Sequence, residues 1–173
     1  MPDLTSHAVR RGPDLPAAPA DTVVLDYDAR FMRRKVLVTE AGHSLHVDLP
    51  ETISLGDGDA FETVDGILVA VVAAPEPLIE IHADAEGLAR LAWHIGNRHT
   101  PAQIAAGRIL IRQDHVMADM LTRLGAHTHS VTAPFTPEGG AYGPGRTHGH
   151  HHSHDARTDP DAAARGTPRP HGH

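Results

Sequence analysis

Hydrophobic positions in the first half of the chain recur with the short period of β-strands. Apolar runs at residues 23–25, 35–39 and 44–49 are separated by turn residues, and the third run alternates apolar with polar side chains. A further apolar run covers residues 66–73, after a turn rich in glycine and aspartate. No stretch with helical spacing lies between these runs. We therefore predict a small all-β domain over residues 22–75.

Beyond this domain the pattern changes to strands that alternate with helices. Short strands are expected at residues 78–81, 102–104, 108–112 and 127–132, the last as an edge strand. Asp84 and Asp114 each precede apolar positions at helical spacing, and Gly96 and Gly125 end the two predicted helices. The resulting order, β-α-β-β-α-β over residues 78–142, is the ferredoxin-like arrangement. The predicted fold class is therefore α+β.

Three other segments lack the pattern of a folded core. Residues 1–21 are rich in Pro, Ala, Asp and Arg, and they predict a disordered leader. Residues 74–77, with the sequence Ala-Pro-Glu-Pro, predict a linker because proline donates no ladder hydrogen bond. Residues 143–173 contain no Val, Leu, Ile, Met, Phe, Trp or Tyr, so they predict a disordered tail.

Composition excludes several classes of protein and of site. The net charge of -7 disfavours non-specific nucleic-acid binding. No apolar run reaches the roughly 20 residues that span a bilayer, and the N-terminus does not resemble a signal peptide. Cysteine is absent, which removes disulfides and thiolate metal sites. We expect a cytoplasmic protein that binds neither membrane nor nucleic acid.

Catalytic motifs are also missing from the sequence. Lys35 is the single lysine, and no phosphate-binding GxxxxGK[ST] motif is present. A zinc hydrolase would need an open metal position and a nearby general base, but the histidine pair at residues 94 and 99 does not form an HExxH motif. We therefore expect a protein that is not an enzyme.

Histidine is unusually frequent, at 16 of 173 residues, and many histidines lie in the predicted tail. Neutral imidazole suits Ni(II), Cu(II) and Zn(II), and a flexible chain can wrap two or three rings around one ion. The alternative is an expression tag or compositional drift. Gly and Ser interrupt this cluster, however, and 19 more residues follow it. We therefore expect metal binding by His148, His150, His151, His152 and His154.

Six histidines outside the tail are candidates either for structural roles or for metal binding. Spacing alone favours a helix C-cap and a polar loop for His94 and His99, because residues five apart do not share a helical face. His115 would lie in the first turn of a helix capped by Asp114, where the helix dipole favours the neutral imidazole that binds metal. His43, His46 and His82 lie in or beside β segments, where a histidine is more often solvent-facing than a ligand.

Three sequence blocks carry a resemblance to a known family. They are HIGNRHTP at residues 94–101, DHVMADML at residues 114–121 and PF-x-PEG-x-AY at residues 134–142. Together with Arg33-Arg34, Leu49-Pro50 and Gly58-Asp59, they resemble the urease accessory protein UreE over roughly residues 30–154. The GNRH motif followed by x-P is the most specific part.

The resemblance implies a nickel metallochaperone with a definite architecture. Its N-terminal β domain would resemble a peptide-binding module, and its ferredoxin-like domain would bind metal and form a homodimer. His99 matches the family's interface ligand, so that two-fold symmetry brings two imidazoles to one ion. His115 matches a histidine that is a ligand in some members. Gln113 stands where some relatives have another histidine, which places any site that depends on that histidine in doubt.

The expected function is therefore the capture of Ni(II) and its delivery for assembly of the urease metallocentre. The implied partners are a second copy of the chain, the urease accessory GTPase and the urease apoprotein complex. Zn(II) and Cu(II) are other ions that the same imidazoles accept. The alternative function is a histidine-rich metal buffer or storage protein without specific transfer, and a peptide-binding role of the β domain is a separate hypothesis.

Overall fold

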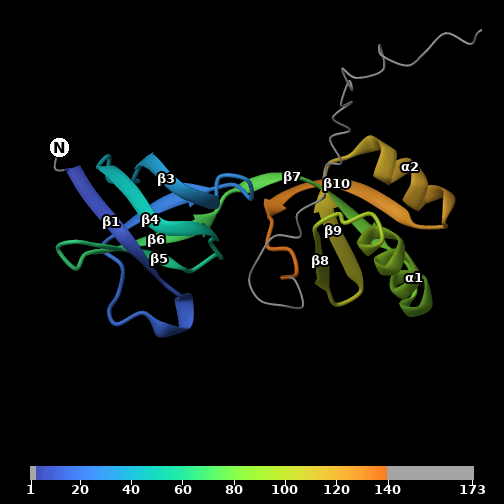
Figure 1. Cartoon of the computed structure of the whole chain (residues 1–173). Coiled ribbons are helices and arrows are strands. Elements are labelled where there is room, and N and C mark those ends of the chain that lie inside the picture. The colour runs from blue at the N-terminus through green and yellow to red at the C-terminus, as the bar shows by residue number, and fades with distance from the viewer. Residues whose placement is uncertain (1–2, 140–173) are drawn as a thin grey trace, which may run out of the picture.

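The computed structural model describes residues 3–139, which form two β-sheets, two α-helices and one short 3-10 turn (Figure 1). The fold is mixed α+β and consists mostly of sheet. The predicted tail, residues 143–173, lies outside the described residues together with its seven histidines. Within the described part of the chain, no helix is long and apolar enough to cross a membrane.

The first sheet contains six strands in the order β2-β6-β5-β1-β4-β3. Strand alternation places Leu45, Phe61, Val69 and Val71 in its core, where each is fully buried. The strands are β1 (Asp3–Arg10), β2 (Asp21–Leu25), β3 (Phe31–Val38), β4 (Ser44–Ser54), β5 (Ala60–Thr63) and β6 (Leu68–Ala73). The predicted strands correspond to β2, β3, β4 and β6, whereas β1 and β5 were not predicted.

The prediction that residues 1–21 form a disordered leader is wrong for the residues that the structure describes. Strand β1 lies inside the first sheet, parallel to β4 and antiparallel to β5. Its Leu4 and Ser6 are buried, and the one hydroxyl hydrogen of Ser6 is shared between the carbonyl oxygens of Ala8 and Glu62, at 2.9 and 2.8 Å from Oγ. A buried serine is tolerated where its hydroxyl is paired in this way.

The predicted linker at residues 74–77 is also mostly strand. Strand β7 (Pro75–His82) begins one residue after β6 ends, so only Ala74 separates the two sheets. Pro75 and Pro77 lie opposite residues of β10 only, because the pairing of β7 with β9 starts at Leu78. Prolines fit this half-paired stretch because they have no N–H to donate.

The second sheet has the order β10-β7-β9-β8, and its elements follow the predicted sequence β-α-β-β-α-β. All of its neighbouring strands are antiparallel. Strand β10 lies at one edge, as predicted. After β7 the elements are α1 (Ala85–Gly96), β8 (Ala102–Ala105), β9 (Arg108–Arg112), α2 (His115–Arg123) and β10 (His127–Pro134).

Both helices cover the same face of the second sheet (Figure 1). Ile81 and Ile111 of the central strands pack there against Leu91, Ile95 and Leu121, and all five side chains are at least 98% buried. Burying an apolar side chain of this size stabilises the fold by about 1.5–3 kcal/mol. Within residues 3–139, no helix covers the opposite face of the sheet.

A small aromatic cluster joins the two sheets. Tyr27, from the loop after β2, packs edge-on against Phe135, with ring centroids 5.3 Å apart. Leu78 and Leu110 of the second sheet complete the cluster. Arg30 is 3% exposed, lies with its guanidinium 5.8 Å from the centre of the Tyr27 ring and donates a hydrogen bond to the Phe135 carbonyl oxygen. The junction is therefore packed rather than open.

Candidate metal centre

The helix that leads to the GNRH motif is defined by its first residue and by its apolar face. The Asp84 carboxylate caps α1 by accepting the Gly87 backbone N–H at 2.7 Å, as the sequence predicts. Leu91 and Ile95 are buried against the sheet, with Leu88 and Ala92 partly buried beside them. These contacts fix the orientation of α1 on the sheet and therefore the position of the residues that follow it.

The chain turns sharply where α1 ends. The Arg98 backbone N–H donates to the Ile95 carbonyl oxygen at 3.1 Å, and the His99 N–H donates to the Gly96 carbonyl oxygen at 2.9 Å. The Arg98 guanidinium donates to the His94 carbonyl oxygen at 3.1 Å, which satisfies another acceptor of the last helical turn. The expectation of a helix end followed by a polar loop is confirmed.

His99 adopts a backbone conformation that side chains rarely occupy. Its φ is +54°, and among residues 3–139 no other non-glycine residue has a positive φ. Glycine is the usual residue at such a position after a helix, and a Cβ there costs roughly 1–2 kcal/mol. Strained residues of this kind concentrate at functional sites. The left-handed backbone holds an exposed imidazole at the tip of the turn.

His99 borders a shallow groove of about 210 Å³ between α1, β8 and the segment after β10. Glu138 lies on the same groove, and its backbone N–H donates to the Ala102 carbonyl oxygen at 2.8 Å. Ile104, which is 55% exposed, also lines it. We did not predict a role for Glu138, although it belongs to the PEG part of the third sequence block.

His115 is the first residue of α2 and is exposed. The Asp114 carboxylate caps this helix by accepting the backbone N–H groups of Val116 and Met117 at 2.8 and 3.0 Å, as predicted. Met117 and Leu121 are buried and fix the helix on the sheet. The imidazole of His115 is therefore free of the core and presented at a rigid helix start.

Strand register places His99 and His115 at the same end of the second sheet. Ala102, three residues after His99, pairs with Ile111, four residues before His115. The described residues do not bring three or more His, Asp or Glu side chains together as a metal site. His148, His150, His151, His152 and His154 lie outside the described residues. Each described chain thus offers two exposed imidazoles at this end.

Histidines of the first sheet have structural surroundings. His43 Nδ1 lies 3.1 Å from the Asp21 carboxylate, in the turn between β3 and β4. His46 is exposed on β4, as expected. Neither lies at the end of the second sheet that carries His99.

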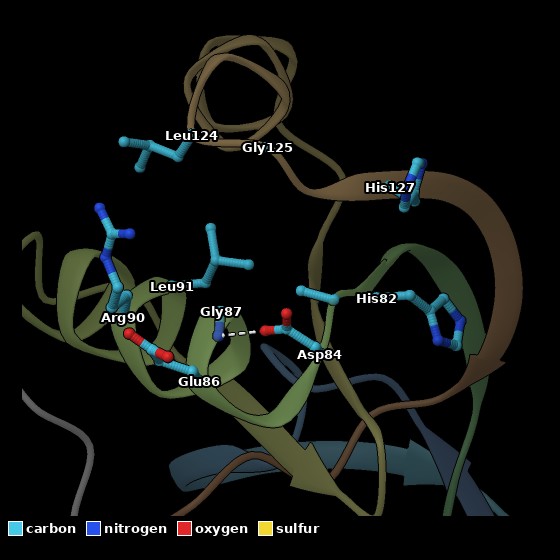
Figure 2. Close-up of a pocket in the computed structure, with 10 residues that line it drawn as sticks. His82, Asp84, Glu86, Gly87, Arg90, Leu91, Leu124, Gly125 and His127 are labelled. Atoms are coloured by element: carbon cyan, nitrogen blue, oxygen red, sulfur yellow. Dashed lines mark hydrogen bonds between the residues drawn. The ribbon is translucent and has the colours of Figure 1, made fainter.

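One hollow near the two helices is bordered by several polar side chains. It has a volume of about 670 Å³ and lies between α1 and the end of α2 (Figure 2). Leu91 and Arg90 line it together with His82 and His127, and its Asp84 carboxylate is engaged as the α1 cap. It lies at the end of the second sheet opposite His99, and its two histidines come from β7 and β10.

Comparison with known proteins separates the same two parts of the chain. Residues 5–74 match the N-terminal domain model of the UreE urease accessory protein, and residues 76–173 match its C-terminal domain model. The chain belongs to the UreE urease accessory protein family. The N-terminal match begins within β1, in agreement with the finding that this strand is part of the folded sheet.

Relatives in the family are similar over most of their length. The urease accessory protein UreE of a Ruegeria species is 60% identical over 131 residues, which cover 76% of this chain and 73% of the relative. That of Ruegeria pomeroyi is 56% identical over 75% of this chain and 85% of the relative. That of Paracoccus denitrificans is 58% identical over 72% and 79%. The family resemblance inferred from the motifs is confirmed.

Proposed function

We propose that the chain is a nickel metallochaperone, which captures Ni(II) through histidines and delivers it for assembly of the urease metallocentre. The observation that carries the proposal is the exposed, left-handed His99 in a urease accessory protein. Neutral imidazole binds Ni(II) well, and a site without thiolates releases it readily. The role is delivery in the cytoplasm rather than catalysis.

The nickel site is shared between two copies of the chain. One exposed imidazole binds a metal ion weakly, but a two-fold axis near His99 supplies two. Trp93 on α1 and Ile104 on β8 are 65% and 55% exposed, and a dimer formed through the C-terminal domain would bury such apolar side chains. His115 is the second donor at this end, and the tail histidines supply ions to the shared site.

We also propose an assignment of the chain to two domains. We assign β7 to β10 with both helices to the ferredoxin-like class, on the basis of their element and sheet orders. The N-terminal β domain then begins at β1, and the boundary lies at Ala74. The urease accessory GTPase and the urease apoprotein complex are the proposed recipients.

Nickel titration of the full-length chain tests the shared site, with mass measured at each step. We expect one tightly held ion per dimer, and its loss in His99→Ala. His94→Ala is the matched control, because His94 lies on the same helix end and should leave the ion in place. A His99→Ala dimer that retains the tight ion would overturn the assignment. Deletion of residues 143–173 should lower capacity and leave one ion per dimer.

Transfer separates delivery from the alternative of a metal buffer. In a reconstituted mixture that contains the GTPase and a competing chelator, nickel should reach the GTPase directly from the loaded protein. Its transfer should be faster than the release of nickel into solution. If the protein loses nickel at the same rate with and without the GTPase, the metal-buffer alternative is favoured. The His99→Ala variant serves as the control, because its tail still binds metal.

A further inference from the structure

One end of the second sheet presents polar side chains on the face that no described helix covers, whereas the rest of that face carries Leu78 and Leu110 of the aromatic cluster. On β7, Ile79 and Ile81 pack under the helices. Glu80 and His82 alternate with them, so they lie on the opposite face. Figure 2 shows the His82 ring pointing away from Leu91.

Strand register brings two more histidines to this face. His127 of β10 lies directly opposite His82, and His129 lies directly opposite Glu80. Residues so paired in antiparallel strands have Cβ atoms about 4.5–5.5 Å apart. The ring centroids of His82 and His129 are 6.0 Å apart. Three imidazoles and one carboxylate therefore form a single group, which we call the open-face patch: Glu80, His82, His127 and His129.

The Glu80 carboxylate of the patch already has two partners, His82 and Arg108. Glu80 Oε1 lies 2.7 Å from His82 Nε2, and the Arg108 guanidinium donates to Oε2 at 2.7 Å. A glutamate carboxylate carries a negative charge at neutral pH. A negative charge thus faces the imidazoles at neutral pH.

For the donors to surround one ion, the rings must rotate and the hydrogen bond between His82 and Glu80 must be exchanged for bonds to the metal. In the present rotamers, the residues that the structure describes bring no three such donors together around one ion. The His82 side chain is 40% exposed, and His127 and His129 are exposed. Rotation between staggered wells is therefore open to His127 and His129, whereas His82 must first release Glu80. Zinc binds imidazole nitrogen and carboxylate oxygen at roughly 2.0–2.2 Å, usually with four ligands in a tetrahedron.

We propose that His82, His127 and His129, with Glu80, bind one divalent ion of the zinc type at a site separate from His99. The two sites lie at opposite ends of the sheet. His82 ends β7 beside the start of β10, whereas His99 precedes the start of β8, where Ala102 pairs with Ile111. The open-face site is formed within one chain and does not need the dimer. It gives each chain a metal position independent of the proposed nickel site.

The test uses the full-length chain with competing histidines removed. The background replaces His99 by Ala and the seven tail histidines by Gln: His148, His150, His151, His152, His154, His171 and His173. Zinc chloride is added while the histidine ring nitrogens are followed by two-dimensional NMR. We expect the rings of His82, His127 and His129 to shift together and to saturate at one zinc per chain. Unchanged spectra of these three rings at one equivalent would overturn the proposal.

Affinity measurements on the same background add matched variants. His129→Gln and His127→Gln should each weaken zinc binding tenfold or more, whereas His46→Gln, on an exposed strand position of the first sheet, should leave it unchanged. Both strand variants alter exposed side chains, and unchanged circular dichroism will verify their fold. Equal zinc affinity in all three variants would overturn the proposal. Because His99 is already absent, this result is independent of the proposed nickel site.

Discussion

The guanidinium of Arg30, which precedes β3, donates a hydrogen bond to the backbone carbonyl of Phe135, which follows β10. Both residues are buried, and they come from opposite ends of the described chain. Arg112 strengthens the same junction by donating to the Asp28 carboxylate at 2.6 Å. The two sheets are thus held together by an apolar cluster that contains a satisfied buried cation.

Phe135→Ala should destabilise the protein by about 3–5 kcal/mol, because it removes a fully buried aromatic ring and leaves a cavity. Denaturant unfolding of the metal-free protein measures the loss. Thr136→Ala is the control, since Thr136 is the exposed neighbour and should change stability by less than about 0.5 kcal/mol. Equal effects of the two substitutions would show that the cluster does not hold the junction.

His99→Gly should yield a more stable metal-free protein than His99→Ala, by about 1 kcal/mol. Glycine accepts the positive φ at this position without strain, whereas alanine keeps the Cβ. Thermal unfolding in the presence of a chelator measures the difference. Both variants should also lose the nickel ion that we propose is shared between two chains. A glycine variant that is no more stable than the alanine variant would contradict a strained turn.

Asp114→Ala should cost about 0.5–2 kcal/mol, because the carboxylate caps two backbone N–H groups at the start of α2. Asp119→Ala, an exposed change in the middle of the same helix, should cost less than about 0.5 kcal/mol. Urea unfolding compares the two. If both substitutions cost the same, general charge rather than capping stabilises the helix.

Asp21→Asn should destabilise the protein at neutral pH and have little effect near pH 2. Burial acts to raise the pKa of Asp21, but hydrogen bonds from Thr39, His43 and the N–H groups of Thr22 and Ala41 outweigh it and lower the pKa from 3.8 to about 2. The stabilisation is therefore full above pH 4 and is lost as the pH falls through about 2. Unfolding free energies of both proteins between pH 2 and 7 test this. A difference that is constant with pH would exclude the ionised carboxylate as its source.

Local patterns predicted the elements of the second sheet well because each of its helices begins with a side chain that caps it. Asp84 and Asp114 cap helices at the predicted residues, since a capping bond joins positions two or three apart. Strand β1 was missed because its inward positions include Ser6, whose burial depends on acceptors at Ala8 and at the distant Glu62. No local pattern reveals that pairing.

The candidate site at His99 was predictable because His99 belongs to a short sequence motif. The resemblance to a family singled out His99, whereas spacing alone indicated a helix end. The structure places His99 in the turn after α1 with a positive φ, and the comparison confirms the family. The open-face patch was not predictable from spacing. His82 and His127 are 45 positions apart in the chain, and only the antiparallel register of β7 and β10 sets them side by side.

The single residue between β6 and β7, Ala74, has a consequence for recognition. A joint this short, beside a packed junction, gives the second sheet little freedom to swing relative to the first. A partner that grips the first sheet would therefore also set the direction in which His99 faces. In the proposed transfer of nickel, the N-terminal half of the molecule would then orient His99 toward the protein that receives the ion.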